Sequence, residues 1–235
     1  FRLHKQMTVD LRYLQNEDTY LPIALTALSA QFASIEQAAS FYRGIATEIR
    51  KNQFLRGALT YYYLVKCGDW TVDAPDCNPV IDCFTNSYKI VGIFAVIESL
   101  SDENHQDFYG WLRQHNAISL PISDVKALDR LHGKYKETFG SIRRCAKFFE
   151  QLPAARQEEL RKAVEIDKRP VPSIKKLAEF LYTVRSKFVH EAELVLQLSG
   201  SMHHFGLDKL LYTKLTMPLI CTAFEEGFVA YFGEA

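Results

Sequence analysis

The chain has 235 residues, of which 48% are hydrophobic and 24% charged, and its 28 Lys and Arg balance its 28 Asp and Glu. This length and composition favour one large helical domain over two tightly packed halves, and they exclude extensive disorder and indiscriminate coating of nucleic acid. The longest apolar run, around residues 91–97, is too short to span a bilayer, and no charged leader precedes it. We therefore expect a soluble, cytoplasmic protein with no membrane partner.

The cysteines and histidines give no metal-binding pattern. Five irregularly spaced cysteines argue against a disulfide framework. Cys67, Cys77 and Cys83 cluster around one loop, but no CxxC or paired-His spacing accompanies them. His203 and His204 are adjacent in a predicted turn and lack a partner at helical spacing. We therefore expect no metal and no other cofactor.

Helical patterns dominate the first hundred residues. The first twenty residues are polar and predict a short or frayed helix, and residues 21–32 form an apolar segment typical of a core. Ser34 and Gln37 form a capping box that predicts a helix to about residue 51. Residues 54–65 are interpreted as another helix, although three successive tyrosines also fit a strand. A loop over residues 68–79 and a helix over residues 80–100 follow.

Glu98 lies on the predicted buried stripe of that last helix. A carboxylate on such a stripe needs a partner, because an isolated buried charge is very costly. We hypothesise that Glu98 pairs with Lys187 or Arg185 and holds a later helix in register.

The second half of the chain is helical and basic. Helices are predicted over residues 101–116, over residues 124–151 with a bend near Gly140, over residues 154–166, and over residues 207–232 with a kink at Pro218. Arg143, Arg144 and Lys147 share one helix face, which is either a solvated surface or the wall of a groove for a nucleic-acid backbone. Residues 123–190 carry 16 Lys and Arg against 9 Asp and Glu.

The longest predicted helix covers residues 173–198 and begins at Ser173. Its apolar stripe consists of Ile174, Leu177, Leu181, Val184, Phe188, Val195 and Leu198. At about 100° per residue, a second set lies on the flank or far side of the helix, namely Tyr182, Arg185, Ser186, Val189, His190 and Glu193. We therefore expect a base, a cation and a hydroxyl on one exposed surface, which suits phosphoryl chemistry.

The order Arg185, Ser186, three further residues and His190 resembles the RSxxxH signature of HEPN (higher eukaryotes and prokaryotes nucleotide-binding) domains, especially the Apea-like branch. Two other segments resemble that branch: AVIESL, which contains Glu98, and FGSIRRCAKFFEQLP before the signature helix. The resemblance implies an all-α helical bundle. A HEPN-like four- or five-helix core would occupy residues 79–235, and additional N-terminal helices at residues 1–78 would pack on it as one compact unit.

HEPN domains are commonly dimers, and many with intact Arg and His are metal-independent endoribonucleases. The resemblance implies that His190 acts as general acid or base for attack of the 2′-hydroxyl on the adjacent phosphate, while Arg185 stabilises the developing charge and Ser186 positions the reactants. Binding of RNA would fall to Tyr182, Lys187, Arg143, Arg144 and Lys147, with Glu98 and Glu193 as supporting residues. A homodimer through the signature helix would complete the cleft, in a defence, toxin or stress-response setting.

The alternative is a non-enzymatic HEPN-like interaction or nucleotide-binding module of a larger protein. In that case Arg185 and His190 pair with Glu98, Glu191 or Glu193 and stabilise the bundle. The sequence begins at Phe1 rather than Met, which suggests a fragment and leaves room for upstream domains or an antitoxin-like partner.

Overall fold

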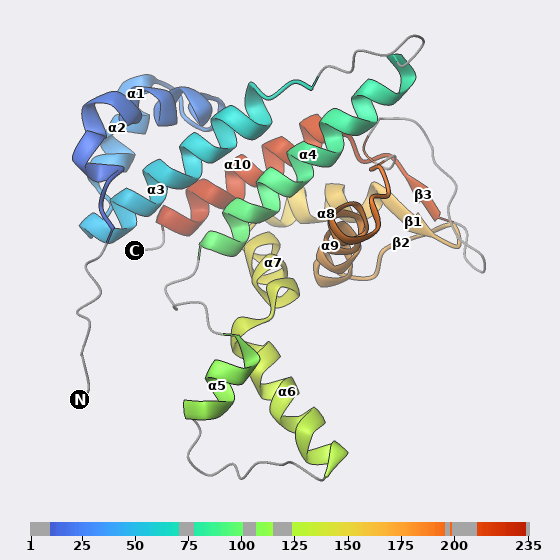
Figure 1. Cartoon of the computed structure of the whole chain (residues 1–235). Helices are drawn as coiled ribbons and strands as arrows, with labels where there is room; N and C mark the ends of the chain where they lie inside the picture. The colour runs from blue at the N-terminus through green and yellow to red at the C-terminus, as the bar shows by residue number, and fades with distance from the viewer. Residues whose placement is uncertain are drawn as a thin grey trace.

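Helices make up most of the chain, so the predicted all-α fold is confirmed. The computed structural model describes residues 10–70, 78–100, 107–114, 124–195, 198 and 211–233. Figure 1 shows most helices gathered into one body, from which α5 (Phe108–Gln114) and α6 (Val125–Phe139) project as an arm. One hydrophobic core extends from Ala24 to Phe232 and joins the N-terminal helices to the rest of the body.

Short helices and turns form the N-terminal part: η1 (Leu14–Asn16), α1 (Glu17–Ala27), η2 (Ser29–Gln31), α2 (Ile35–Arg43), α3 (Glu48–Tyr61) and the π-helical turn η3 (Tyr62–Lys66). Ser34 caps α2 as predicted, because its hydroxyl accepts a hydrogen bond from the backbone N–H of Gln37 at 3.2 Å. The prediction of one helix to residue 51 is wrong. The chain turns at Gly44, and Thr47 caps α3 as a new helix.

The remaining helices of the body are α4 (Asn78–Ser99), α7 (Ser141–Glu150), α8 (Ala154–Lys162), α9 (Ile174–Glu191) and α10 (Met217–Gly233). Gly140 has an extended backbone and separates α6 from α7, so the predicted bend is confirmed. The closing helix is shorter than predicted. Because it begins at Met217, Pro218 lies in the first turn, where a missing N–H costs little and no kink results.

A small antiparallel sheet replaces helix at two places where the sequence predicted helix. Its strands are β1 (Val164–Ile166), β2 (Arg169–Pro170) and β3 (Leu211–Thr213), in the order β2-β1-β3. Asp167 and Lys168 both have positive φ and form a two-residue hairpin turn between β1 and β2. The pairing of β1 with β3 ends the predicted helix over residues 154–166 early, a long-range effect that local periodicity does not reveal.

Glu225 on α10 anchors the N-terminal helices through a buried polar cluster. Only 5% of Glu225 is exposed. Its carboxylate accepts hydrogen bonds from the Tyr61 hydroxyl at 2.6 Å, Lys66 Nζ at 3.1 Å and Gln31 Nε2 at 3.2 Å. Lys66 also donates to the Ala27 carbonyl at 2.6 Å. The buried charge is therefore compensated, as a stable fold requires.

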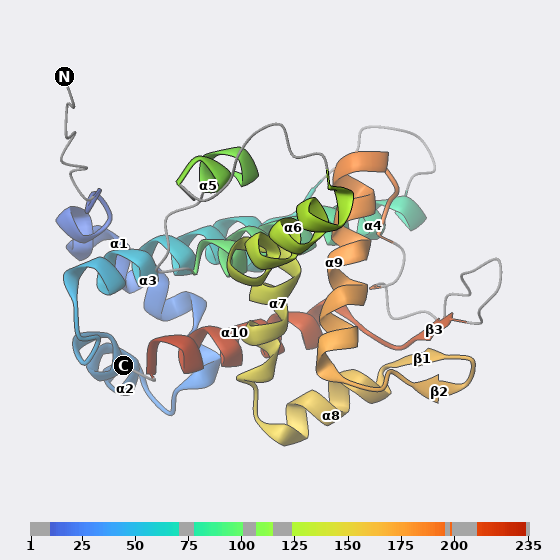
Figure 2. The same ribbon diagram turned by 90° about the horizontal axis from the view of Figure 1, so that it is seen from below.

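The helices that position the candidate site are α4, α7 and α9. All three pack against one another, and Figure 2 shows α9 running beside α7 while α6 continues from α7 across the front of the body. Residues of the signature therefore face either the interior between these helices or the outer side of α9. Those two directions have different chemistry.

Candidate functional site

The signature helix begins as predicted but ends earlier. Ser173 caps α9, since its hydroxyl accepts a hydrogen bond from the Lys176 N–H at 3.2 Å. Ala192 takes a left-handed conformation with φ 56° and ends the helix, whose last residue is Glu191. The predicted helix extended seven residues further, to Leu198. Val195 and Leu198 are still buried, although they lie beyond the helix. Their helical spacing therefore predicted correctly that both side chains are buried, but it predicted wrongly that their backbone is helical.

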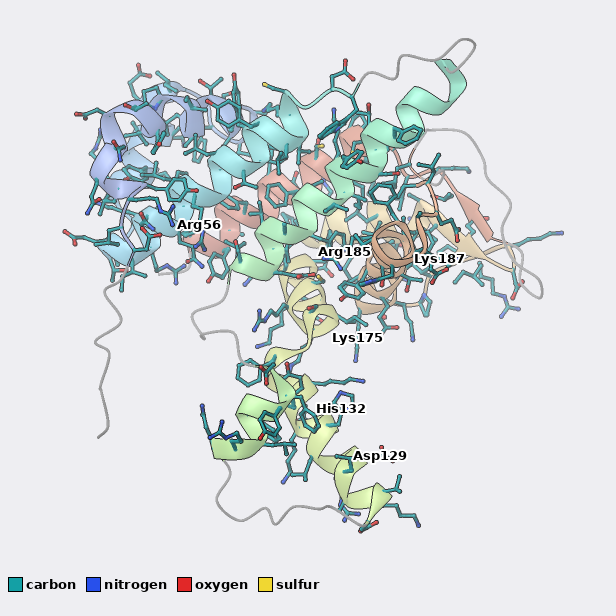
Figure 3. The ribbon with its side chains drawn as sticks, in the orientation of Figure 1. Arg56, Asp129, His132, Lys175, Arg185 and Lys187 are labelled. Atoms are coloured by element: carbon teal, nitrogen blue, oxygen red, sulfur yellow. The ribbon has the colours of Figure 1, made fainter. Side chains whose placement is uncertain are left out.

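Arg185 faces the interior of the bundle. The buried residues of α9 are Ile174, Leu177, Ala178, Leu181 and Val184. At about 100° per residue they span an arc of about 120° from Val184 to Ala178, and Arg185 falls within that arc. Its side chain is 17% exposed. Figure 3 shows Arg185 on the side of α9 that faces α4, whereas Lys187 lies on the opposite side.

Glu98 on α4 is the partner of Arg185. Arg185 Nη2 lies 3.8 Å from Glu98 Oε1, and the Glu98 side chain is 26% exposed. One of the two hypothesised pairings is therefore confirmed. The other is wrong, because Lys187 instead pairs with Glu193 at 2.9 Å in the turn after α9. Hydrogen bonding to Glu193 raises the pKa of Lys187.

The residues around this ion pair hold α4, α7 and α9 together. The Arg185 guanidinium lies 5.6 Å from the centre of the Tyr182 ring. Arg144 Nη1 donates to the Glu98 carbonyl at 3.2 Å, so Arg144 contacts α4 and is not part of an exposed basic face. Cys145 is fully buried beside them, and burial raises the pKa of its thiol to about 12. This thiol is therefore protonated and unreactive at neutral pH.

His190 faces solvent one residue before the end of α9. Its direction differs from that of Arg185 by about 140°, because the two residues are five positions apart on a helix. Ser186 lies one turn before His190 on the outer side and is half-buried. Contrary to the sequence-based prediction, the described residues do not place the guanidinium and the imidazole in one recess.

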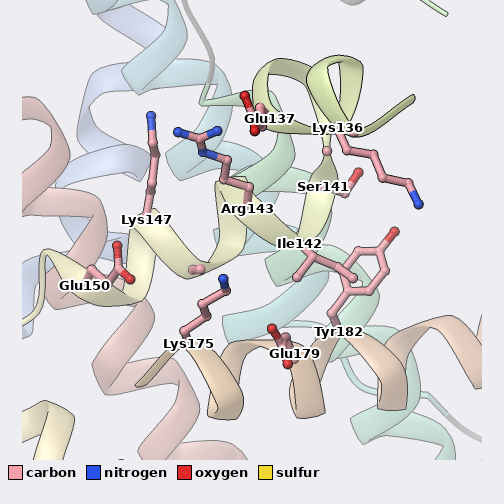
Figure 4. A pocket seen from close by; sticks show the side chains of 13 residues that line it. Lys136, Glu137, Ser141, Ile142, Arg143, Lys147, Glu150, Lys175, Glu179 and Tyr182 are labelled. Carbon is pink, nitrogen blue, oxygen red and sulfur yellow. The ribbon is translucent and has the colours of Figure 1, made fainter. Parts of the chain in front are cut away.

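A groove lies between the end of α6, α7 and the first half of α9, and Figure 4 shows it from close by. Its volume is about 730 Å³. Of the predicted binding residues, Arg143, Lys147 and Tyr182 line it, whereas Arg144 and Lys187 do not. Sequence reasoning missed its other cations, Lys136 and Lys175. They come from separate helices, so only the tertiary packing brings them together.

Carboxylates also line this groove, from Glu137, Glu150 and Glu179. Glu179 forms an ion pair with Lys176 at 2.6 Å and is neutralised locally. Four cations therefore face two carboxylates that have no ion pair among the described residues. The groove is suited to an anionic ligand with an apolar part, because Ile142 and Tyr182 also line it.

The part of the chain that the structure describes contains no group of three His, Cys, Asp or Glu side chains that could hold a metal ion. Cys77, His203 and His204 lie outside the described residues. None of the helices in the described ranges is both long and apolar enough to cross a bilayer.

In comparisons with known proteins, no family model, curated protein or solved structure matches the chain. The resemblance to HEPN domains therefore stays a prediction.

Proposed function

We propose that this chain is a HEPN-like helical module that binds RNA through the groove between α6, α7 and α9 and does not cut it. The observation that carries the proposal is that Arg185 and His190, the two ends of the signature, point in different directions. Arg185 pairs with Glu98 toward the interior, while His190 faces solvent about 140° away. General acid–base catalysis at one phosphate needs both groups within hydrogen-bonding reach of it.

The groove supplies the contacts that the signature lacks. Arg143 and Lys147 are one helical turn apart on α7 and extend from one side of it, and Lys175 extends from α9 toward α7. Guanidinium and ammonium groups bind phosphate oxygens through charge-assisted hydrogen bonds. Such contacts are independent of sequence and weaken as salt rises, because the bound cations release counterions from the RNA.

Endoribonuclease activity is the second candidate, and it is favoured by the accessibility of His190. Within the described residues His190 makes no hydrogen bond or ion pair, so its imidazole is free to meet a ligand. Catalysis would require a second copy that supplies a cation opposite His190, or release of Arg185 from Glu98. The expected homodimer through the signature helix belongs to this second candidate.

A cleavage assay separates the two candidates. Labelled mixed-sequence RNA is incubated with the parent protein and with His190→Ala in the presence of a chelator. The proposal predicts intact RNA with both proteins. Cleavage by the parent that disappears in His190→Ala establishes the second candidate instead.

Binding is measured on the same RNA with two groove variants and one matched control. Arg143→Ala and Lys147→Ala are expected to weaken binding and to lower the salt slope by about 0.7 for each lost single-strand phosphate contact. Lys162→Ala removes an equal charge from α8, outside the groove, where the lysine side chain is 66% exposed. Equal losses in all three variants would show that only net charge matters and would remove the groove from the proposal.

A further inference from the structure

The two ends of the groove differ in chemistry. At one end Arg143 and Lys147 extend from the same face of α7, and Lys175 rises from α9 toward α7 (Figure 4). At the other end Tyr182 directs its hydroxyl-bearing ring toward Ser141, and Ile142 lies beside it (Figure 4). The one cation that the described residues place at this end, Lys136, extends from α6. Ile142 is 41% exposed, so the groove itself offers apolar surface to a ligand.

We infer that the groove holds a single unpaired nucleotide of an RNA strand with a fixed polarity, its phosphate near Arg143, Lys147 and Lys175 and its base against Ile142 and Tyr182. This inference rests on the proposed function and names the class of RNA that the groove takes. Cationic donors recognise the phosphate, and aliphatic and aromatic surfaces receive the flat face of any base. The groove volume of about 730 Å³ falls in the range of about 300–1,000 Å³ typical of small-ligand sites.

This arrangement selects for single strands. In a duplex the bases are stacked and paired in the interior, so only the backbone could reach the cationic end of the groove. An unpaired nucleotide can present its phosphate and its base together. Binding of single-stranded RNA should therefore exceed binding of a duplex, although a duplex carries more charge per unit length.

Glu150 also lines the cationic end, where Figure 4 shows it below Lys147 on α7, and its charge would repel a bound phosphate. Three cations and this one carboxylate line the end, so it keeps a positive surplus. Replacing Glu150 by Gln removes the repulsion and preserves the shape of the side chain. This variant is expected to strengthen binding about twofold to fivefold at low salt.

Three labelled probes test the inference: a single-stranded RNA, an abasic strand of equal length and charge, and a duplex of the same sequence. Ile142→Ser is the most informative variant, because Ile142 is exposed and contributes little to the core. It should weaken binding of the base-bearing strand about tenfold and leave the abasic strand within about twofold. Lys147→Ala should weaken binding of both strands, and Lys162→Ala should affect neither.

The outcomes distinguish the inference from the proposed function. If none of the probes binds the parent protein, the proposed function itself fails. If RNA binds and Lys147→Ala weakens it, but Ile142→Ser lowers both strands equally or the duplex binds as tightly as the single strand, the proposed function stands and the inference is overturned. Thermal unfolding of each variant confirms that a loss of binding does not arise from a loss of fold.

Discussion

A double-mutant cycle on Arg185 and Glu98 tests whether the signature arginine is a structural residue. Arg185→Met keeps an apolar stem of similar length, and Glu98→Gln keeps the shape of the carboxylate. Each single change leaves one charge without its partner between α4 and α9. The double change removes both charges, so it is expected to cost less than the sum of the two single changes.

The magnitude follows from the distance and the exposure of the pair. At about 4 Å two unit charges attract by about 4 kcal/mol at an effective dielectric constant of 20, and by about 1 kcal/mol in water. The 3.8 Å separation is longer than a hydrogen bond, and 17% of the Arg185 side chain and 26% of the Glu98 side chain are exposed. We therefore expect a coupling free energy of about 1–2 kcal/mol and a cost of about 2–3 kcal/mol for each single change.

Urea unfolding followed by circular dichroism gives the free energy of unfolding of the parent, the two single variants and the double variant. The cycle on Lys187 and Glu193 serves as the control, because that pair is more exposed and should couple by less than about 1 kcal/mol. An Arg185→Met protein with unchanged stability, or additive effects of the two changes, would refute the structural role of Arg185.

Three further predictions concern backbone strain, packing and pH. Ala192→Gly should raise the free energy of unfolding by about 0.5–1 kcal/mol in urea titrations, because Ala192 has φ 56° and glycine adopts this conformation without a steric penalty. Gly227→Ala should lower it by about 1–3 kcal/mol, since a Cβ at Gly227 would lie 2.7 Å from the Phe148 ring; a fully stable variant would contradict this packing. Burial raises the pKa of Cys145 to about 12, so the folded chain holds this proton more tightly than the unfolded chain. The free energy of unfolding should therefore fall by up to about 1.4 kcal/mol per pH unit between about pH 9 and pH 12. At pH 8, iodoacetamide should modify exposed Cys67 but not buried Cys145.

Local sequence signals predicted the helix boundaries that depend on local chemistry. Ser34 and Ser173 cap their helices through side-chain hydrogen bonds, and Gly140 separates two helices. The end of α9 was missed because the residue that adopts the left-handed conformation there is Ala192. An alanine gives no helix-ending signal in the sequence, whereas glycine or proline would. The strands were missed because β1 is stabilised by pairing with β3, which lies far away in sequence.

The candidate site shows the same division. The pairing of Arg185 with Glu98 was one of two hypotheses, since a carboxylate on a buried stripe requires a partner. The interior direction of Arg185 was missed because the apolar stripe was drawn without Ala178, whose inclusion widens the buried arc past Arg185. Lys175 could have been found as a companion of Tyr182, because both lie on the same side of α9 two turns apart. The groove itself depends on how α6, α7 and α9 pack, which periodicity does not reveal.

The most direct measurement follows binding and cleavage in one and the same RNA-binding reaction. Labelled single-stranded RNA is incubated with the parent protein in chelator and divided, so that one half runs under native conditions and the other half under denaturing conditions. We expect a shifted band on the native gel, weakened by Lys147→Ala, and full-length RNA on the denaturing gel. Fragments that appear with the parent protein and vanish with His190→Ala, or RNA that is neither shifted nor cut, would contradict it.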